Sequence, residues 1–455
     1  MNSSYKKRLI MRSLKVVHVL VVIALFYFFW KANSRRMHTL IAAGIFGASY
    51  CMLSRVYNAY SVGMYSVGHL LYSQTLSKFL SMALAYVVVA LRLWRWINPL
   101  MLIVLMFVYI AMDLTFIYLA DKLYFKMIKP KKTVVVYRNK ADLRKLDEIN
   151  NYPKRFKICK YVESPEDYES LVDEIKGFSA VFVVGIPATL RNGLVKYCVE
   201  NGVKAYIHPH VGDLIMAGAQ PMQMFSIPIM SVQRAQPTPE YLMVKRLIDI
   251  VVSAVALVVL SPVMLVTAIA IKANDRGPVF YSQMRITKDR KPFRMWKFRS
   301  MRVDAEKDGI QLSAGANDDR ITAVGKIIRA CRVDELPQLF NILKGDMTIV
   351  GPRPERPESA VQYEREIPAF ALRLQVKAGL TGFAQVYGRY NTTPYDKLQM
   401  DLMYINRMSI FEDIRLMFAT VKILFMKDST QGYSQEQMEA FEEAKRENME
   451  NPENM

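Results

Sequence analysis

The first 125 residues carry four apolar stretches separated by short polar segments. They lie at Val16–Trp30, His38–Ser54, Leu80–Leu93 and Leu100–Phe116. Each is close to the roughly 20 residues that an α-helix needs to cross a bilayer, although the first and third need flanking residues to reach that length. The pattern predicts an N-terminal transmembrane region of about four helices over residues 1–125. A buried helix bundle in a soluble protein is the alternative.

Basic residues flank this region on both sides, at residues 6–15 and again at residues 122–132. By the positive-inside rule, four spans with both ends in the cytoplasm fit these two clusters. Lys31, Arg35 and Arg36 then lie outside, against the rule. They also stand where a signal peptide would carry a cleavage site of small residues, so we expect a retained anchor.

From residue 132 to residue 232, short β-branched runs alternate with helical stretches. The predicted strands are Thr133–Tyr137, Phe156–Tyr161, Ala180–Gly185 and Lys204–Ile207, and the predicted helices are Ala141–Ile149, Tyr168–Ile175 and Leu190–Asn201. This alternation predicts an α/β domain of the Rossmann-like kind with a parallel sheet. No GxGxxG turn follows the first strand, so we expect a degenerate nucleotide fold. A structural or regulatory role and a weak ligand site near Gly185–Pro187 or His208–His210 both stay open.

The last third of the chain opens on another long apolar stretch, Leu247–Ile271, interrupted by Ser261 and Pro262. A proline inside a helix removes a hydrogen bond and kinks the helix. Basic residues stand at both ends of the stretch. A straight crossing would place the downstream residues outside the cell, whereas a helix that bends at Pro262 and returns keeps both basic ends in the cytoplasm. We favour the second, a re-entrant membrane helix.

This helix belongs to a predicted C-terminal domain, residues 241–428, that is mainly α-helical. Near its end, Ser409–Met426 has apolar and charged residues at helical spacing. Such a helix either lies in the membrane interface or covers the core. Residues 429–455 are rich in Gln and Glu and predict a polar tail.

Composition supports a membrane region joined to soluble parts. Of 455 residues, 52% are hydrophobic and 22% charged, and the mean hydropathy is +0.09. The net charge of +20 suits anionic lipid headgroups and phosphorylated substrates; long apolar spans argue against a nucleic-acid partner. The four cysteines are widely spaced and form no CxxC, so neither a disulfide framework nor a zinc site is implied.

A pair of acidic residues, Asp334 and Glu335, carries the candidate chemistry. Leu336, Pro337 and an apolar-periodic stretch follow it, and proline is tolerated in a helix's first turn. We therefore expect both carboxylates at a helix N-terminus, whose free N–H groups and partial positive charge suit a phosphate. Adjacent helical positions point about 100° apart, so one carboxylate can attack phosphorus while the other holds Mg²⁺. An acidic N-cap turn is the structural alternative.

Three cations are candidates for substrate binding. Arg353 stands between two prolines and is a preset guanidinium suited to bidentate phosphate contact. Lys297 and Arg299 are further candidates, with solvated surface or lipid-headgroup contact as their alternative. Asp346 is a further candidate for the site, and a turn at Lys344–Asp346 is its structural alternative.

The acidic pair belongs to a series of motifs in a consistent order. They are Gly277–Gln283, Lys291–Met301, Asp318–Thr322, Arg332–Met347, Thr348–Glu355 and Gly379–Val386. The series, from Lys245 to Asp428, strongly resembles the bacterial sugar transferase family of monotopic polyprenyl-phosphate phosphoglycosyl transferases. The N-terminal spans and the degenerate nucleotide fold resemble its large-architecture members, the undecaprenyl-phosphate glucose or galactose phosphotransferases of exopolysaccharide biosynthesis. Cys331 stands where relatives often carry Thr or Ser, and we expect it to pack as a small apolar residue.

The resemblance implies a transferase with Asp334 as nucleophile and Glu335 as a ligand of Mg²⁺. Asp334 would attack the sugar-linked phosphate of a UDP-sugar, release UMP and form an aspartyl phosphosugar. Undecaprenyl phosphate would then accept the phosphosugar, which starts exopolysaccharide or capsule synthesis. The resemblance further implies a multi-pass protein of the bacterial inner (cytoplasmic) membrane that contacts membrane lipids. Its catalytic domain would lie on the cytoplasmic face, and a homodimer is compatible with it.

Two other functions are considered. A membrane scaffold whose middle domain senses a nucleotide or binds assembly partners predicts no turnover and indifference to Asp334→Asn. Hydride chemistry in the middle domain is disfavoured by the absent glycine fingerprint. Which sugar is transferred stays open, because no residue decides it.

Overall fold

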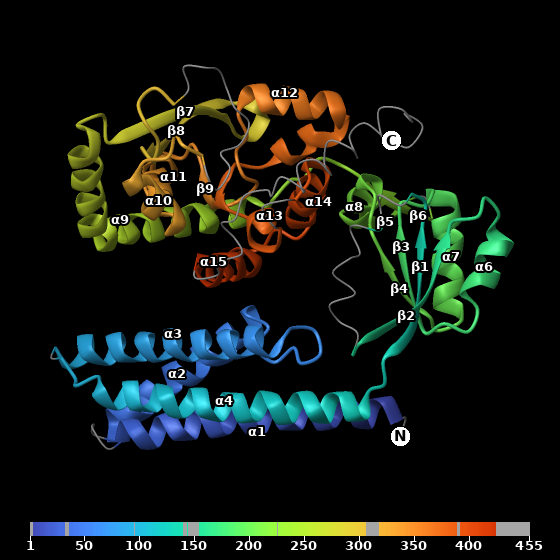
Figure 1. Cartoon of the computed structure of the whole chain (residues 1–455), viewed down its shortest axis with the longest axis horizontal. Helices are drawn as coiled ribbons and strands as arrows, with labels where there is room; N and C mark the ends of the chain where they lie inside the picture. The colour runs from blue at the N-terminus through green and yellow to red at the C-terminus, as the bar shows by residue number, and fades with distance from the viewer. Residues whose placement is uncertain are drawn as a thin grey trace. The chain divides into compact units, whose positions relative to one another are not determined.

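The computed structural model describes residues 3–31, 36–94, 96–139, 143, 154–224, 226–305, 318–388 and 392–424 (Figure 1). The chain divides into two compact units, residues 1–208 and 209–455. The second unit thus begins upstream of residue 241, where we predicted the catalytic domain to start. Nearly all of the helix predicted at 141–149, and the polar tail, lie outside the described residues.

Four long helices open the first unit (Figure 1). They are α1 (Ser3–Lys31), α2 (Arg36–Val56), α3 (Val67–Leu93) and α4 (Leu100–Met127). All four are long and apolar enough to cross a membrane, as is α9 in the second unit. Each includes a predicted apolar stretch and extends beyond it, since charged residues can continue a helix past the bilayer. Stacked rings of Phe26, Phe46 and Tyr109 fill the bundle core.

A polar cluster is buried inside this helix bundle. The ammonium of Lys78 on α3 pairs with the carboxylate of Asp113 on α4, and both side chains are fully buried. His18 on α1 lies 3.4 Å from Asp113 through Nε2 and 2.8 Å from the Tyr60 hydroxyl through Nδ1. Tyr60 in turn shares a hydrogen bond with Tyr50 of α2. The cluster therefore connects all four helices.

An α/β layer completes the first unit. Its parallel strands are ordered β2 (Phe156–Glu163), β1 (Lys131–Tyr137), β3 (Ala180–Val184) and β4 (Lys204–Ile207). The two central strands are largely buried, which explains their continuous β-branched runs. Helices α6 (Tyr168–Ile175) and α7 (Ala188–Glu200) pack on each other, and Figure 1 shows both to one side of the sheet. The four predicted strands are all present.

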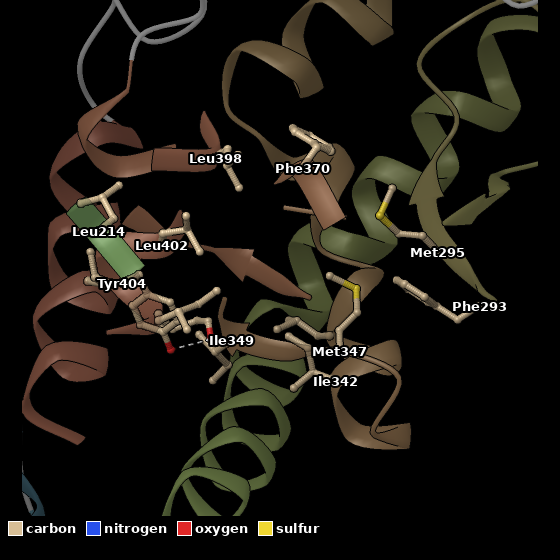
Figure 2. Close-up of a cluster of buried hydrophobic side chains, with 14 residues drawn as sticks. Leu214, Phe293, Met295, Ile342, Met347, Ile349, Phe370, Leu398, Leu402 and Tyr404 are labelled. Atoms are coloured by element: carbon tan, nitrogen blue, oxygen red, sulfur yellow. Dashed lines mark hydrogen bonds between the residues drawn. The ribbon is translucent and has the colours of Figure 1, made fainter. Parts of the chain in front are cut away.

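The second unit begins with elements that the sequence did not lead us to expect. Helix α8 (Val211–Ala217) is followed by an antiparallel hairpin of β5 (Gln220–Met224) and β6 (Ile227–Ser231). Leu214 of α8 packs into the main core of this unit (Figure 2).

The predicted re-entrant segment is one long helix, α9 (Pro239–Asp275), with Pro262 inside it. Proline has no N–H for the carbonyl four residues earlier. The Ser261 hydroxyl instead donates to that carbonyl, Val258 O, at 2.8 Å. The helix changes direction along its length in Figure 1. Its course through a bilayer stays a prediction.

The remaining elements surround a compact core. The strands are β7 (Phe280–Ile286), β8 (Pro292–Phe298), β9 (Thr348–Val350) and β10 (Gly379–Thr381). The helices are α10 (Ala323–Ala330), α11 (Gln338–Lys344), α12 (Pro357–Glu366), α13 (Phe383–Tyr387), α14 (Pro394–Ile405) and α15 (Ile410–Leu424), with 3-10 turns η2 (Lys288–Arg290), η3 (Val333–Glu335) and η4 (Pro368–Gln375). Figure 2 shows Met295 of β8, Met347 just before β9, Phe370 of η4, and Leu402 and Tyr404 of α14 converging in this core.

Two backbones approach closely where β9 pairs with β10. A Cβ at Gly379 would lie 2.1 Å from the Gly351 nitrogen, and one at Gly351 would lie 2.4 Å from Lys377 O. Only glycine fits at both positions. The glycines of two predicted motifs thus bring Gly351, and the loop that follows it, against β10.

Candidate active site

The acidic pair lies in its own turn. Asp334 and Glu335 belong to η3, which Leu336 closes by donating its N–H to Val333 O at 3.2 Å. Pro337 then takes the N-cap position of α11. The pair therefore precedes α11 and does not open it, which corrects the predicted position by one turn. The left-handed backbone of Arg332, with a φ of 53°, separates this turn from α10.

Two of the predicted cations reach Glu335 from different elements. Arg353, in the loop after β9, places Nη2 2.8 Å from Glu335 Oε1. Lys297, on β8, places Nζ 3.4 Å from the same oxygen. The Glu335 side chain is only 13% exposed, whereas that of Arg353 is 41% exposed. The cations thus bind a nearly buried carboxylate while one of them keeps a face open to a ligand.

These contacts separate the pKa values of the two carboxyls. Burial alone would raise the pKa of Glu335, but the charges of Arg353 and Lys297 outweigh it and hold that pKa well below its usual range. Burial, and next the charge of Glu335, raise the pKa of Asp334 to about 6, against the opposing charges of Lys297, Arg329 and Arg353. Within the described ranges, no hydrogen bond reaches the Asp334 carboxylate. An ionised, firmly held Glu335 therefore sits beside an unpaired Asp334.

Arg299 is engaged elsewhere. Its Nη1 lies 2.6 Å from Asp275 Oδ2, at the end of α9, and its Nε donates to Pro278 O at 2.7 Å. Its predicted contact with substrate stays a prediction. Asp346 accepts a hydrogen bond from the Asn341 side chain at 3.3 Å. Ser261 and Pro262, the predicted kink residues, lie inside α9, where Ser261 donates to Val258 O.

The donor set suits a magnesium ion that is shared with a substrate. No group of three or more His, Cys, Asp or Glu side chains in the described part of the chain is placed to hold a metal by itself. Mg²⁺, however, is commonly bound by one or two carboxylates together with substrate phosphates. Both arginine and lysine contacts fall on Oε1 of Glu335. Its second oxygen and the Asp334 carboxylate are thus the oxygens that fit the ion.

Three residues around the Arg353 loop, of which Arg373 and Asp401 are buried, escaped the sequence analysis. Arg373 on η4 donates to Arg353 O and to Glu355, and pairs with Asp401 on α14. Arg285 on β7 donates to Pro354 O. A single sequence carries no signal for them, because they lie 20 or more residues from Arg353 along the chain and outside its motif.

Comparison with known proteins identifies the family of the chain. The sequence profile of the family described as bacterial sugar transferase matches residues 240–427. Over 191 residues the chain is 38% identical to the UDP-glucose:undecaprenyl-phosphate glucose-1-phosphate transferase of Caulobacter vibrioides, a match that covers 41% of this chain and 71% of that protein. The chain belongs to the bacterial sugar transferase family.

Two further relatives are matched over a smaller share of their length. An Aeromonas hydrophila UDP-N-acetylgalactosamine-undecaprenyl-phosphate N-acetylgalactosaminephosphotransferase is 42% identical over 41% of this chain and 45% of its own length. A Klebsiella pneumoniae UDP-glucose:undecaprenyl-phosphate glucose-1-phosphate transferase is 45% identical over 39% of each chain. The matches span less than half of these relatives, and the relatives' names differ in the sugar.

Proposed function

We propose that the protein transfers a sugar 1-phosphate from a UDP-sugar to undecaprenyl phosphate. The observation that carries the proposal is the pairing of Glu335 with Arg353 and Lys297 beside the unpaired carboxylate of Asp334. The names of the relatives, which describe undecaprenyl-phosphate sugar-phosphate transferases, support the same reaction. We propose further that the lipid-linked product starts exopolysaccharide or capsule synthesis, as the resemblance of the motif series implies.

In the first step, a carboxylate oxygen of Asp334 attacks the phosphorus that bears the sugar. The bond from this phosphorus to the bridging oxygen breaks, and UMP leaves with that oxygen. The product is an aspartyl phosphosugar. With a pKa of about 6, Asp334 is mostly ionised at neutral pH and able to attack.

In the second step, an oxygen of undecaprenyl phosphate attacks the same phosphorus. The bond between phosphorus and the Asp334 oxygen breaks, which restores the carboxylate and yields undecaprenyl-diphosphosugar. Both steps break P–O bonds, so the sugar keeps its anomeric configuration. Arg353 binds the phosphoryl oxygens with its exposed face, since phosphoryl transfer depends on positioning and charge neutralisation. Mg²⁺, when bound at Glu335, supplies further neutralisation of phosphate charge.

UMP release by the full-length protein in nanodiscs tests the reaction. The assay contains Mg²⁺, undecaprenyl phosphate and a panel of UDP-sugars, with Asp334→Asn alongside. We expect release with one sugar, lost in the variant. Without undecaprenyl phosphate, we expect a burst of one UMP per active site and a protein mass increased by one phosphosugar. UMP release that always requires the acceptor would contradict the covalent intermediate. Inactivity with every donor would favour the scaffold.

We also propose that α9 is re-entrant and that the second unit, residues 209–455, faces the cytoplasm. We call this the catalytic unit, because it carries Asp334 and Glu335. Basic residues at both ends of α9 and the proline inside it support this course. Cys331, which we expected to pack as a small apolar residue, is instead exposed in the catalytic unit and reports its side. A variant that keeps only this cysteine should react with a membrane-impermeant maleimide in inverted vesicles but not in intact spheroplasts. Labelling in spheroplasts would place the unit outside.

A further inference from the structure

Four consecutive carbonyls of the loop that carries Arg353 accept hydrogen bonds from residues outside the loop. Pro352 O accepts from the Gly379 N–H at 2.9 Å, and Glu355 O accepts from the Ile286 N–H at 3.1 Å. Between them, the carbonyl of Arg353 accepts from Arg373 Nη2 at 2.9 Å, and that of Pro354 accepts from Arg285 Nη1 at 3.1 Å. The two prolines cannot donate hydrogen bonds, so the carbonyls are the groups by which the loop is fixed.

Arg373 has the most extensive hold on this loop. Its side chain is 3% exposed, and its guanidinium binds three separate groups. Nε lies 2.8 Å from Asp401 Oδ2, Nη1 lies 3.1 Å from Glu355 Oε1, and Nη2 lies 2.9 Å from Arg353 O. The planar fork of an arginine can reach acceptors in three directions at once, which a lysine ammonium on its flexible stem cannot reproduce.

Asp401 completes a chain of contacts that runs to the acidic pair, Asp334 and Glu335. It is 1% exposed and fixes Arg373 from α14. Arg373 fixes the backbone of Arg353, and the Arg353 side chain binds Glu335. Among the residues that the structure describes, Arg373 binds Asp401, Glu355 and Arg353 but not Asp334, Glu335 or Lys297, so its effect on the site must pass through the loop.

We propose that Arg373, oriented by Asp401, is a positioning residue for the transfer reaction: it holds the Arg353 backbone so that the guanidinium meets Glu335 and the substrate phosphate. This inference rests on the proposed function. Displacing a catalytic group by about 1 Å can slow a reaction by about a hundredfold, so a loosened loop is expected to lower the rate even in a folded protein.

A double-mutant cycle with Arg353 tests the proposal. Arg373→Lys keeps the charge but loses the fork, and we expect kcat for UMP release to fall about tenfold or more per folded molecule. In an Arg353→Gln background, the same change should have almost no further effect, because the group that it positions is gone. Equal fold-losses in both backgrounds would overturn the proposal.

Asp413→Asn is the matched control. Asp413 is a carboxylate of the same unit, 6% exposed, that pairs with Lys245 and Tyr404. Those partners reach Val350 O but not the carbonyls from Pro352 to Glu355. Its effect should multiply with that of Arg353→Gln. If Arg373→Lys does not fold, Asp401→Asn takes its place in the same cycle, since it weakens the hold on Arg373 while it keeps the side chain's volume.

A second cycle, in thermal unfolding without metal, separates this proposal from the proposed function. Glu335→Gln should lower the unfolding temperature less in the Arg373→Lys background than in the wild type, because the Arg353–Glu335 pair is already loosened. A wild-type protein inactive with every donor would overturn the proposed function, while this coupling would still support the positioning role. Coupling of zero would overturn the positioning role.

Discussion

Asp334 and Glu335 are neighbours in one 3-10 turn, yet only Glu335 is bound by cations: Arg353 lies 2.8 Å and Lys297 3.4 Å from its Oε1. The pKa of Glu335 is accordingly lowered, whereas the pKa of Asp334 is raised to about 6. The fold stabilises one carboxylate as an anion and penalises the other.

Removing the two charges should therefore change stability in opposite directions. The folded-state pKa of Asp334 lies above its usual value near 3.8, so its ionisation costs stability above pH 6 and nothing below about pH 4. Asp334→Asn should raise the free energy of unfolding at pH 7.5 by at most about 3 kcal/mol, at 1.36 kcal/mol per pKa unit, and with it the unfolding temperature; the gain should vanish below pH 4.

Glu335→Gln should act the other way at pH 7.5. A lowered pKa contributes stability that is present above the unfolded value near 4.5 and is lost as the pH falls below it. The loss should therefore shrink in acid. Thermal unfolding in detergent and EDTA across this pH range measures both variants, and a fall in unfolding temperature for both at pH 7.5 would refute the asymmetry.

The glycine contact between β9 and β10 predicts a strong sensitivity to a single methyl group. Gly379→Ala would put a Cβ 2.1 Å from the Gly351 nitrogen, a backbone atom that cannot move aside cheaply. We expect loss of the folded protein or a fall of several degrees in unfolding temperature. Gly212→Ala on α8 meets nothing within 4 Å and should be neutral. Equal effects of the two changes would show that β9 and β10 do not approach so closely.

The buried Lys78–Asp113 pair predicts a different pattern in the N-terminal bundle. Lys78→Met leaves a fully buried carboxylate without its cation, which should destabilise the bundle by about 3–5 kcal/mol. The double variant Lys78→Met/Asp113→Leu removes both charges and should recover much of this loss. Resistance of the bundle to unfolding by SDS measures both. A double variant that is no better than Lys78→Met would show that the unpaired carboxylate was not the cause of the loss.

Pro262→Ala tests the predicted re-entry of α9. Alanine supplies the N–H that Val258 O lacks and removes the ring that bends the helix. We expect a straighter helix whose downstream end reaches the far side of the bilayer, so that Cys331 becomes reactive in intact spheroplasts. The Ser261→Ala variant keeps the proline and should retain the wild-type labelling. Unchanged labelling of Pro262→Ala would mean that other contacts set the course of α9.

The pattern of apolar positions was sufficient for the elements with a clear period. The apolar stretches of the N-terminal helices and the strands such as Ala180–Val184 needed only length and β-branched content. The hairpin Gln220–Ser231 was missed, because its strands are exposed and carry no alternation of apolar and polar residues.

The candidate site was partly predictable for a similar reason. Arg353 and Lys297 stand in local motifs, and the structure brings both to Glu335. The engagement of Arg299 with Asp275 depends on how the end of α9 packs against β8, which spacing along the chain does not encode. Arg373 and Asp401 meet only through tertiary packing of η4 on α14.

The first turns of α9 form hydrogen bonds with other elements of the catalytic unit. Lys245 donates to Val350 O, Arg246 donates to Ile342 O and Leu343 O at the end of α11, and Asp249 accepts from Thr348 and Ile349 of β9. Trimming this helix to obtain a water-soluble fragment would leave β9 and the end of α11 without these hydrogen-bond partners. We therefore expect a fragment that lacks these turns to lose part of its core packing, so inhibitors and substrates should be assayed with the whole helix present, in lipid or detergent.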